Sequence, residues 1–399
     1  MNQNNSKQWL SKVPEVTIFF WIIKVLCTTV GETFADYLNF NLGLGLTLTT
    51  TLMGLAFCGV LLLQFRATQY TPGIYWLTVV LISVFGTLVT DNLTDNIGVP
   101  LEASTIVFAV LLGLTFLAWH YSEKTLSIHS IYTRKREAFY WLTILFTFAL
   151  GTAVGDLYSE QLGLGYLNTG LSVILIVVLV YAGWKFVRLD SVLAFWVVYI
   201  LTRPLGASLG DYLSQPKSSG ALGLGTTITS VIFLAAIFSI IVLLTVTRLD
   251  VSVKNELAAV DQVRGNKKQV IRQTYAVMGI FLVIGVGGYI GLDHHISAQM
   301  DTQQTTFAEQ LGDFIQIEQD MLHEVNADNF ATLKTKADEL EHQWDINEPK
   351  LRKMNGAAWT RIDGSIDVVL AAARSGSINV SKSKAAINDS LSIMNNEKL

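Results

Sequence analysis

Four copies of one spacing pattern run through most of the chain, each in strongly apolar sequence. In every copy a tryptophan is followed ten residues later by a glycine and, five residues beyond it, by an aspartate. The tryptophans are Trp21, Trp76, Trp141 and Trp196, the glycines are Gly31, Gly86, Gly151 and Gly206, and the aspartates are Asp36, Asp91, Asp156 and Asp211. Ionisable groups within apolar segments are costly and usually functional. Four acids at equivalent positions therefore indicate one shared site.

Apolar runs long enough to cross a bilayer, about 20 residues each, separate short polar segments. Of the 399 residues, 51% are hydrophobic and only 15% are charged. The runs lie near 15–36, 43–64, 73–92, 100–120, 138–157, 165–187, 191–211 and 222–246, with a ninth near 274–292. This composition predicts an all-α integral membrane protein in contact with the lipid bilayer.

Lysine and arginine are distributed unequally between the connecting segments. Segments on one side hold residues such as Lys12, Arg66 and Arg136, whereas those on the other side hold only Lys217. Basic residues are enriched on the cytoplasmic side of membrane proteins. We therefore predict a cytoplasmic N-terminus, four two-helix hairpins of equal orientation, and an extracytoplasmic C-terminal segment.

The pattern divides the chain into five parts. We predict a cytoplasmic N-terminus (1–13), an eight-span repeat domain (14–248), a cytoplasmic linker (249–272), a ninth span (273–292) and an extracytoplasmic domain (293–399). The repeats cover about 14–66, 71–121, 136–188 and 191–248, and parallel repeats predict a pseudo-fourfold bundle. In 293–399, four amphipathic stripes predict a small helical bundle, the fourth helix starting at an N-cap at Ser381.

Further polar residues accompany the four aspartates. Glu32, Asp95 and Glu160 lie four residues from an aspartate, so a continuing helix would place each pair on one face. Carboxylate oxygens are preferred ligands of hard divalent cations, so these seven acids form the predicted metal site. Four repeated hydroxyl residues are predicted to support the site as oxygen ligands: Thr49, Ser104, Thr169 and Thr229. Two bases within the spans, Lys24 and Arg203, are predicted counter-ions.

The glycines after the aspartates predict tight reversals, because glycine adopts backbone angles that other residues avoid. These glycines are Gly43, Gly98, Gly163 and Gly223. The repeated tryptophans, near the cytoplasmic helix ends, are interpreted as interfacial anchors.

Together these features favour a transporter of small cations, with a divalent metal ion as substrate and with proton exchange as a further expectation. The sequence contains no Walker A, HExxH, GxSxG or CxxC motif, so we expect neither an enzyme nor a bound cofactor. The basic stretch 264–272 fits an orientation signal better than a nucleic-acid site. Two alternatives stay open: a sensor or assembly protein whose outer domain binds a ligand or partner, and, less favoured, an intramembrane enzyme. Oligomeric state is open.

The register of Trp76, Gly86, Asp91 and Gly98, repeated at Trp141, Gly151, Asp156 and Gly163, resembles a known family. Its members are bacterial inner-membrane proteins with four tandem two-helix repeats, a signature tryptophan and unknown function. The resemblance covers about 14–248 and implies the same architecture and the bacterial cytoplasmic membrane. Repeat 4 departs from the pattern through an insertion around Gln215–Ser219.

Overall fold

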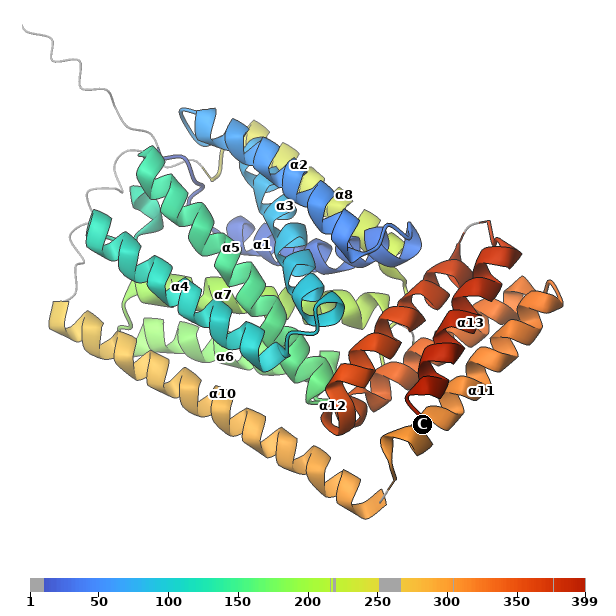
Figure 1. Ribbon diagram of the computed structural model, residues 1–399. Helices are drawn as coiled ribbons and strands as arrows, with labels where there is room; N and C mark the ends of the chain where they lie inside the picture. Colours follow the sequence, from blue (N-terminus) through green and yellow to red (C-terminus); the bar gives the residue numbers. More distant parts are fainter. Residues whose placement is uncertain are drawn as a thin grey trace, which may run out of the picture.

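The computed structural model describes residues 11–215, 217, 220–250, 267–303, 305–375 and 377–398. Within these residues the protein contains twelve α-helices and no β-strand (Figure 1). The predicted all-α class is therefore confirmed for the described part of the chain. Most of the predicted N-terminal segment 1–13 and linker 249–272 lies outside the described residues.

Eight helices make up the repeat domain, two per repeat. They are α1 (Ile18–Asp36), α2 (Leu46–Arg66), α3 (Pro72–Asp91), α4 (Leu101–Glu123), α5 (Arg134–Asp156), α6 (Tyr166–Phe186), α7 (Ser191–Ser214) and α8 (Thr226–Thr247). With α10 (Lys267–Gln303), nine helices in the described ranges are long and apolar enough to cross a membrane. Each corresponds to one of the apolar runs in the sequence.

The first helix of each repeat lies in the interior of the helix bundle, and the second lies at its periphery. Helix α1 packs against α3 and α7, and α5 also packs against α3 and α7. The outer helices α2, α4, α6 and α8 pack on α3, α5, α7 and α1, so each covers the inner helix of the following repeat, and α8 returns to the first. The inner helices are correspondingly more buried than the outer ones.

The repeated glycines explain how closely the inner helices approach. A Cβ atom on Gly31 would lie 2.0 Å from the Ser83 hydroxyl, and one on Gly206 would lie 1.9 Å from the Thr28 hydroxyl. Gly86 and Gly151 face the next inner helix in the same way. Each contact is made to the residue three positions before the next repeat's glycine. Only a residue without a side chain fits between these backbones.

Each of the first three inner helices continues as one π-helical turn beyond its aspartate. These turns are η1 (Tyr37–Asn41), η2 (Asn92–Asn96) and η4 (Leu157–Gln161). The chain then reverses at glycines with positive φ, from +64° at Gly43 to +76° at Gly98. The predicted requirement for glycine at the reversals is confirmed, since L-residues rarely adopt these angles.

The ends of the inner helices opposite the aspartates are closed by aromatic side chains, here called the aromatic end. Trp76, Trp141 and Trp196 are no more than 4% exposed, and the hydroxyls of Tyr75 and Tyr140 lie 2.5 Å apart. The interpretation of these tryptophans as interfacial anchors was wrong. The inner helices converge here, so the rings fill the space between them and join one hydrophobic core.

The C-terminal bundle consists of α11 (Phe307–Asn326), α12 (Phe330–Arg374) and α13 (Val380–Asn396). Helix α12 is broken at Asn355 (φ −156°, ψ 85°), which gives the four predicted helical segments. The predicted N-cap at Ser381 was wrong, because Asn379 caps α13 by accepting from the Lys382 amide. Helix α10 runs along the outside of the repeat helices, and α12 packs against η1, η2 and η4 (Figure 1).

Candidate functional site

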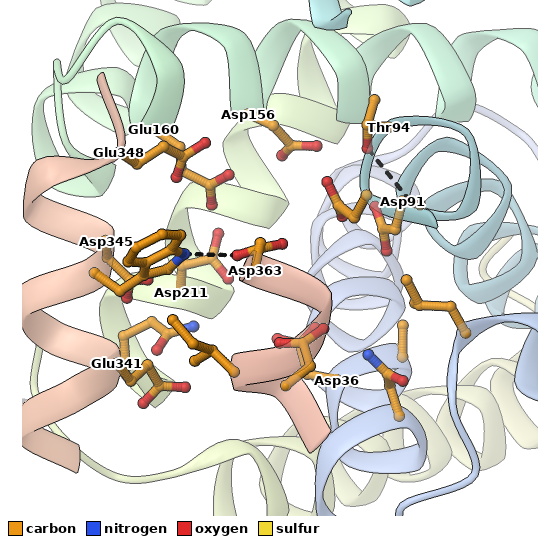
Figure 2. A pocket seen from close by; sticks show the side chains of 18 of the residues that line it. Asp36, Asp91, Thr94, Asp156, Glu160, Asp211, Glu341, Asp345, Glu348 and Asp363 are labelled. Carbon is orange, nitrogen blue, oxygen red and sulfur yellow. Dashed lines mark hydrogen bonds between the residues drawn. The ribbon is translucent and has the colours of Figure 1, made fainter. Parts of the chain in front are cut away.

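A cavity of about 160 Å³ lies between the aspartate-bearing ends of the inner helices and α12. All seven carboxylates predicted from the repeats line it: Glu32, Asp36, Asp91, Asp95, Asp156, Glu160 and Asp211. Figure 2 shows Asp36, Asp91, Asp156 and Asp211 arranged around this space. The repeated acids are thus brought together from four helices, and we call the space the acidic cavity.

Helix geometry places these acids. Asp36, Asp91 and Asp156 are the last residues of α1, α3 and α5, so each carboxylate stands where an inner helix passes into its π-turn. Because the chain stays helical through the π-turn, Asp95 and Glu160 also reach the cavity. In the fourth repeat Asp211 lies one turn inside α7 and is 7% exposed.

The opposite wall comes from α12 and was not predicted. It supplies five more carboxylates and one arginine: Glu341, Asp345, Glu348, Asp363, Asp367 and Arg352. In Figure 2, Glu341, Asp345 and Glu348 follow one side of α12 and face the repeat acids. Spacings of four, three and four residues from Glu341 to Arg352 put these side chains on one helical face. That spacing was visible in the sequence, whereas the face that α12 presents to the repeats was not.

Crowding changes the proton affinity of the α12 acids. Burial raises the pKa of Asp345 well above its usual range, and the neighbouring Glu341 and Glu348 raise it further. Burial likewise raises the pKa of Asp363, with added repulsion from Asp367. The pKa of Asp367 itself is raised to about 8, first by burial and then by Asp95 and Glu341. Asp367 therefore holds a proton near neutral pH unless a cation balances its charge, and Asp345 and Asp363 bind protons more tightly than free carboxyl groups do.

The two predicted counter-ions occupy different surroundings. The Arg203 guanidinium donates to Glu32 at 2.6 Å and also to the Thr87 hydroxyl, so it neutralises one acid at the base of the cavity. Lys24 is 1% exposed and does not line the cavity. Its Nζ lies 3.7 Å from the centroid of the Phe148 ring and 4.3 Å from that of Tyr199. Lys24 thus lies against aromatic faces.

The four predicted hydroxyl donors do not line the acidic cavity. Thr49 and Thr229 donate to the carbonyls of Gly45 and Gly225, each at 2.8 Å. Ser104 and Thr169 are buried at the equivalent positions of α4 and α6. Thr49 and Thr229 lie at the start of outer helices, and each hydroxyl satisfies a backbone carbonyl beside the glycine turn.

The carboxylates surround the cavity without converging on one ion position. Among the described residues, no three histidine, cysteine, aspartate or glutamate side chains are arranged to hold a metal ion together. The wall also includes Tyr166, Trp344 and Trp359. The site is therefore a wide acidic space with aromatic patches, suited to attracting positive charge.

Comparison with protein families identifies the repeats. The Repeat of Unknown Function (DUF347) matches the chain at residues 19–70, 74–125, 139–189 and 194–250, more than half of its length. The chain belongs to the DUF347 repeat family. Each DUF347 repeat supplies one inner helix and one of the four aspartates, which confirms the predicted tandem repeats. Comparisons with curated proteins and with solved structures gave no match.

The DUF347 matches end before α10, so the cavity combines family and non-family elements. Seven of its carboxylates come from the repeats and five from α12, which lies outside the matched ranges. The C-terminal bundle is thus a structural part of the site and contributes its second wall.

Proposed function

We propose that the protein is a membrane transporter of cations and that the acidic cavity is its binding site. The observation that carries this proposal is the convergence of twelve carboxylates on one cavity whose lining includes a single basic residue, Arg352. Such an excess of negative charge in a confined space raises the local concentration of cations. A bound cation would relieve the repulsion between the acids, which gives binding its driving force.

The nine apolar helices support a multi-pass arrangement in a membrane, the bacterial cytoplasmic membrane in the proposal. Basic residues such as Arg66, Lys124 and Arg248 lie at or directly after the helix ends remote from the acidic cavity. By the positive-inside rule that end is cytoplasmic and the C-terminal bundle is extracytoplasmic. The cyclic packing of α1, α3, α5 and α7 supports a pseudo-fourfold axis along the membrane normal, with the cavity on that axis.

Proton exchange follows from the same chemistry. Acids such as Asp367, with a pKa of about 8, are protonated in the cation-free site at neutral pH. Binding of a cation favours their ionised form and releases protons. We therefore expect cation uptake into the cavity to be coupled to proton release.

Flux measurements test the proposal. Purified protein in liposomes should move cations down an imposed gradient, and Asp36→Asn, Asp91→Asn, Asp156→Asn and Asp211→Asn should each reduce the rate about tenfold or more. Asp190→Asn is the matched control, because Asp190 caps α7 away from the cavity and asparagine caps equally well. Unchanged flux in all four cavity variants would refute the assignment of the site.

A second function, sensing, is favoured by the position of the C-terminal bundle. Helix α12 forms one wall of the cavity, so a ligand there would alter the docking of the bundle on η1, η2 and η4. Deleting residues 293–399 separates the two functions. A transporter should keep measurable flux with altered selectivity, whereas a sensor should show no flux in either form.

A further inference from the structure

We propose that the cargo of the acidic cavity is an organic polycation, a flexible chain carrying two or more amine or guanidine groups. This inference rests on the proposed cation-binding function and names its substrate class. It distinguishes such a molecule from a bare divalent metal ion, and four features of the cavity wall support it.

The first feature is a guanidinium that the protein itself places in the cavity. Arg352 donates to Glu348 at 2.9 Å and approaches Asp95 at 3.7 Å. Its guanidinium carbon lies 4.0 Å from the centroid of the Trp359 ring. One organic cation is thus held between carboxylates from both walls and an aromatic face. A cargo cation of similar chemistry would take this place by displacing the Arg352 side chain.

The second feature is the aromatic part of the wall. Trp344 and Trp359 are stacked, with ring centroids 6.0 Å apart and planes inclined by 12°. Trp344 donates to Asp363 at 2.8 Å, which fixes its ring beside a carboxylate. Trp359 is 4% exposed, and its indole N–H has no hydrogen-bond partner among the described residues. Aromatic faces stabilise organic cations and the methylene groups between them, whereas metal ions select oxygen ligands.

The third feature is size and ligand geometry. A cavity of about 160 Å³ is roughly ten times the 10–15 Å³ that holds one water molecule. A dehydrated metal ion needs several oxygen atoms at 2.0–2.6 Å, and in the part of the chain that the structure describes no three His, Cys, Asp or Glu side chains are arranged to hold a metal ion together. The volume and the dispersed acids fit a longer molecule better than a single ion.

The fourth feature is the arrangement of charge. Arg203 pairs with Glu32, Arg374 donates to Glu341 at 2.9 and 2.5 Å, and Arg352 lies between Glu348 and Asp95, so four of the twelve acids have basic partners. The remaining acids form two facing groups, one on the repeats and one on α12. A molecule with separated positive charges can pair with both groups at once, and each charge adds to the affinity.

Calorimetric titration of the full chain in detergent tests this inference, with spermidine, agmatine and manganese chloride as probes. We expect spermidine and agmatine to bind at least tenfold more tightly than Mn²⁺ and to compete with each other. Mn²⁺ binding without measurable binding of either organic cation would overturn the inference and leave the proposed function standing. If none of the three binds and none is transported, both proposals fail.

Two variants locate the binding site. Trp359→Leu should weaken spermidine binding about tenfold and leave Mn²⁺ binding within about twofold, since the loss of a desolvated cation–π contact is of this size. Trp359→Phe keeps an aromatic face and should retain most of the affinity, which controls for misfolding. Arg352→Gln frees Trp359 and Asp95 and should tighten spermidine binding. Equal affinity in wild type, Trp359→Leu and Asp36→Asn would place the bound polyamine elsewhere and refute the inference.

Discussion

The two ends of the inner helices α1, α3, α5 and α7 differ in how charge is balanced. At the aromatic end, Lys12 donates to Glu137 at 2.6 Å, and Gln64 donates to the other carboxylate oxygen at 3.1 Å. At the opposite end, the acidic cavity brings many carboxylates together with one lining arginine. A balanced buried pair is complete within the protein, whereas a surplus of acids requires protons or a cation from outside. The comparison separates a structural ionic contact from a candidate binding site.

The largest expected effect concerns the balanced pair. Lys12→Met leaves Glu137, which is 0% exposed, without its positive partner. Removing one partner of a buried pair typically costs about 3–5 kcal/mol, because the remaining charge is uncompensated. We expect a large drop in the thermal unfolding midpoint in detergent. In contrast, Asp91→Asn in the acidic cavity should leave that midpoint unchanged or raise it, since it removes repulsion.

The double variant Lys12→Met with Glu137→Gln is the control. It removes both charges and keeps a hydrogen-bonding group, so most of the lost stability should return. A double variant as unstable as Lys12→Met would show that packing of the lysine, and not its charge, stabilises the aromatic end. The contrast between the two ends would then lose its electrostatic basis.

The surplus of acids predicts that stability falls as pH rises. The pKa of Asp367 is raised from 3.8 in the unfolded chain to about 8, so the folded state binds the proton more tightly. The stabilisation that this proton provides is complete below about pH 4 and is lost as the pH rises through 8. The free energy of unfolding then falls by on the order of a few kcal/mol. Asp367→Asn should flatten this slope between pH 4 and 8 in thermal unfolding, whereas Asp313→Asn, at an exposed site on α11, should leave it unchanged.

A bound cation should act in the opposite direction. At pH 8, where Asp367 begins to ionise, saturating spermidine should restore part of the midpoint lost relative to pH 5, because ligands that bind only the folded state stabilise it. At pH 5 its effect should be smaller, because protons already occupy the site. Equal stabilisation by spermidine at pH 5 and at pH 8 would argue against proton exchange at the acidic cavity.

Much of this arrangement follows from periodic patterns in the sequence. The spacing of Trp, Gly and Asp predicted the hairpins, the shared position of the aspartates and the pairing of Asp91 with Asp95. These inferences succeeded because helix geometry converts spacing directly into a face. The glycine turns were predictable for a similar reason, since few residues adopt positive φ.

Contacts between segments far apart in the sequence could not be predicted from periodic patterns. Glu341 and Asp345 lie more than 100 residues after the last repeat aspartate, Asp211, and periodicity along α12 does not specify which surface it meets. Trp76, Trp141 and Trp196 were misinterpreted for the same reason, because an amphipathic ring suits both an interface and a core. Their burial depends on the convergence of four helices, which is a tertiary property.

A smaller effect is expected where the inner helices cross between the two ends. Gly206→Ala would place a methyl group against the Thr28 hydroxyl and 2.9 Å from the Thr29 backbone nitrogen. The Thr28 side chain can rotate away but the Thr29 backbone cannot. We therefore expect the free energy of unfolding to fall by about 1–3 kcal/mol, the usual range for overpacking. Gly59→Ala on α2 has no atom within 4 Å and should be neutral or slightly stabilising. Equal midpoints for the two variants would contradict the close approach of α7 and α1.

The smallest effect should come from the hydrogen bond at the aromatic end. Tyr140→Phe leaves the Tyr75 hydroxyl, which is buried, without the partner it has at 2.5 Å, and should lower stability by about 1 kcal/mol. The double variant Tyr75→Phe with Tyr140→Phe removes both polar groups and should recover about half of that loss or more. Neither variant should alter cation flux if this end only closes the bundle. Faster flux in the double variant, with an unchanged unfolding midpoint, would instead make the tyrosine pair part of the transport path, and the two ends would then share one function.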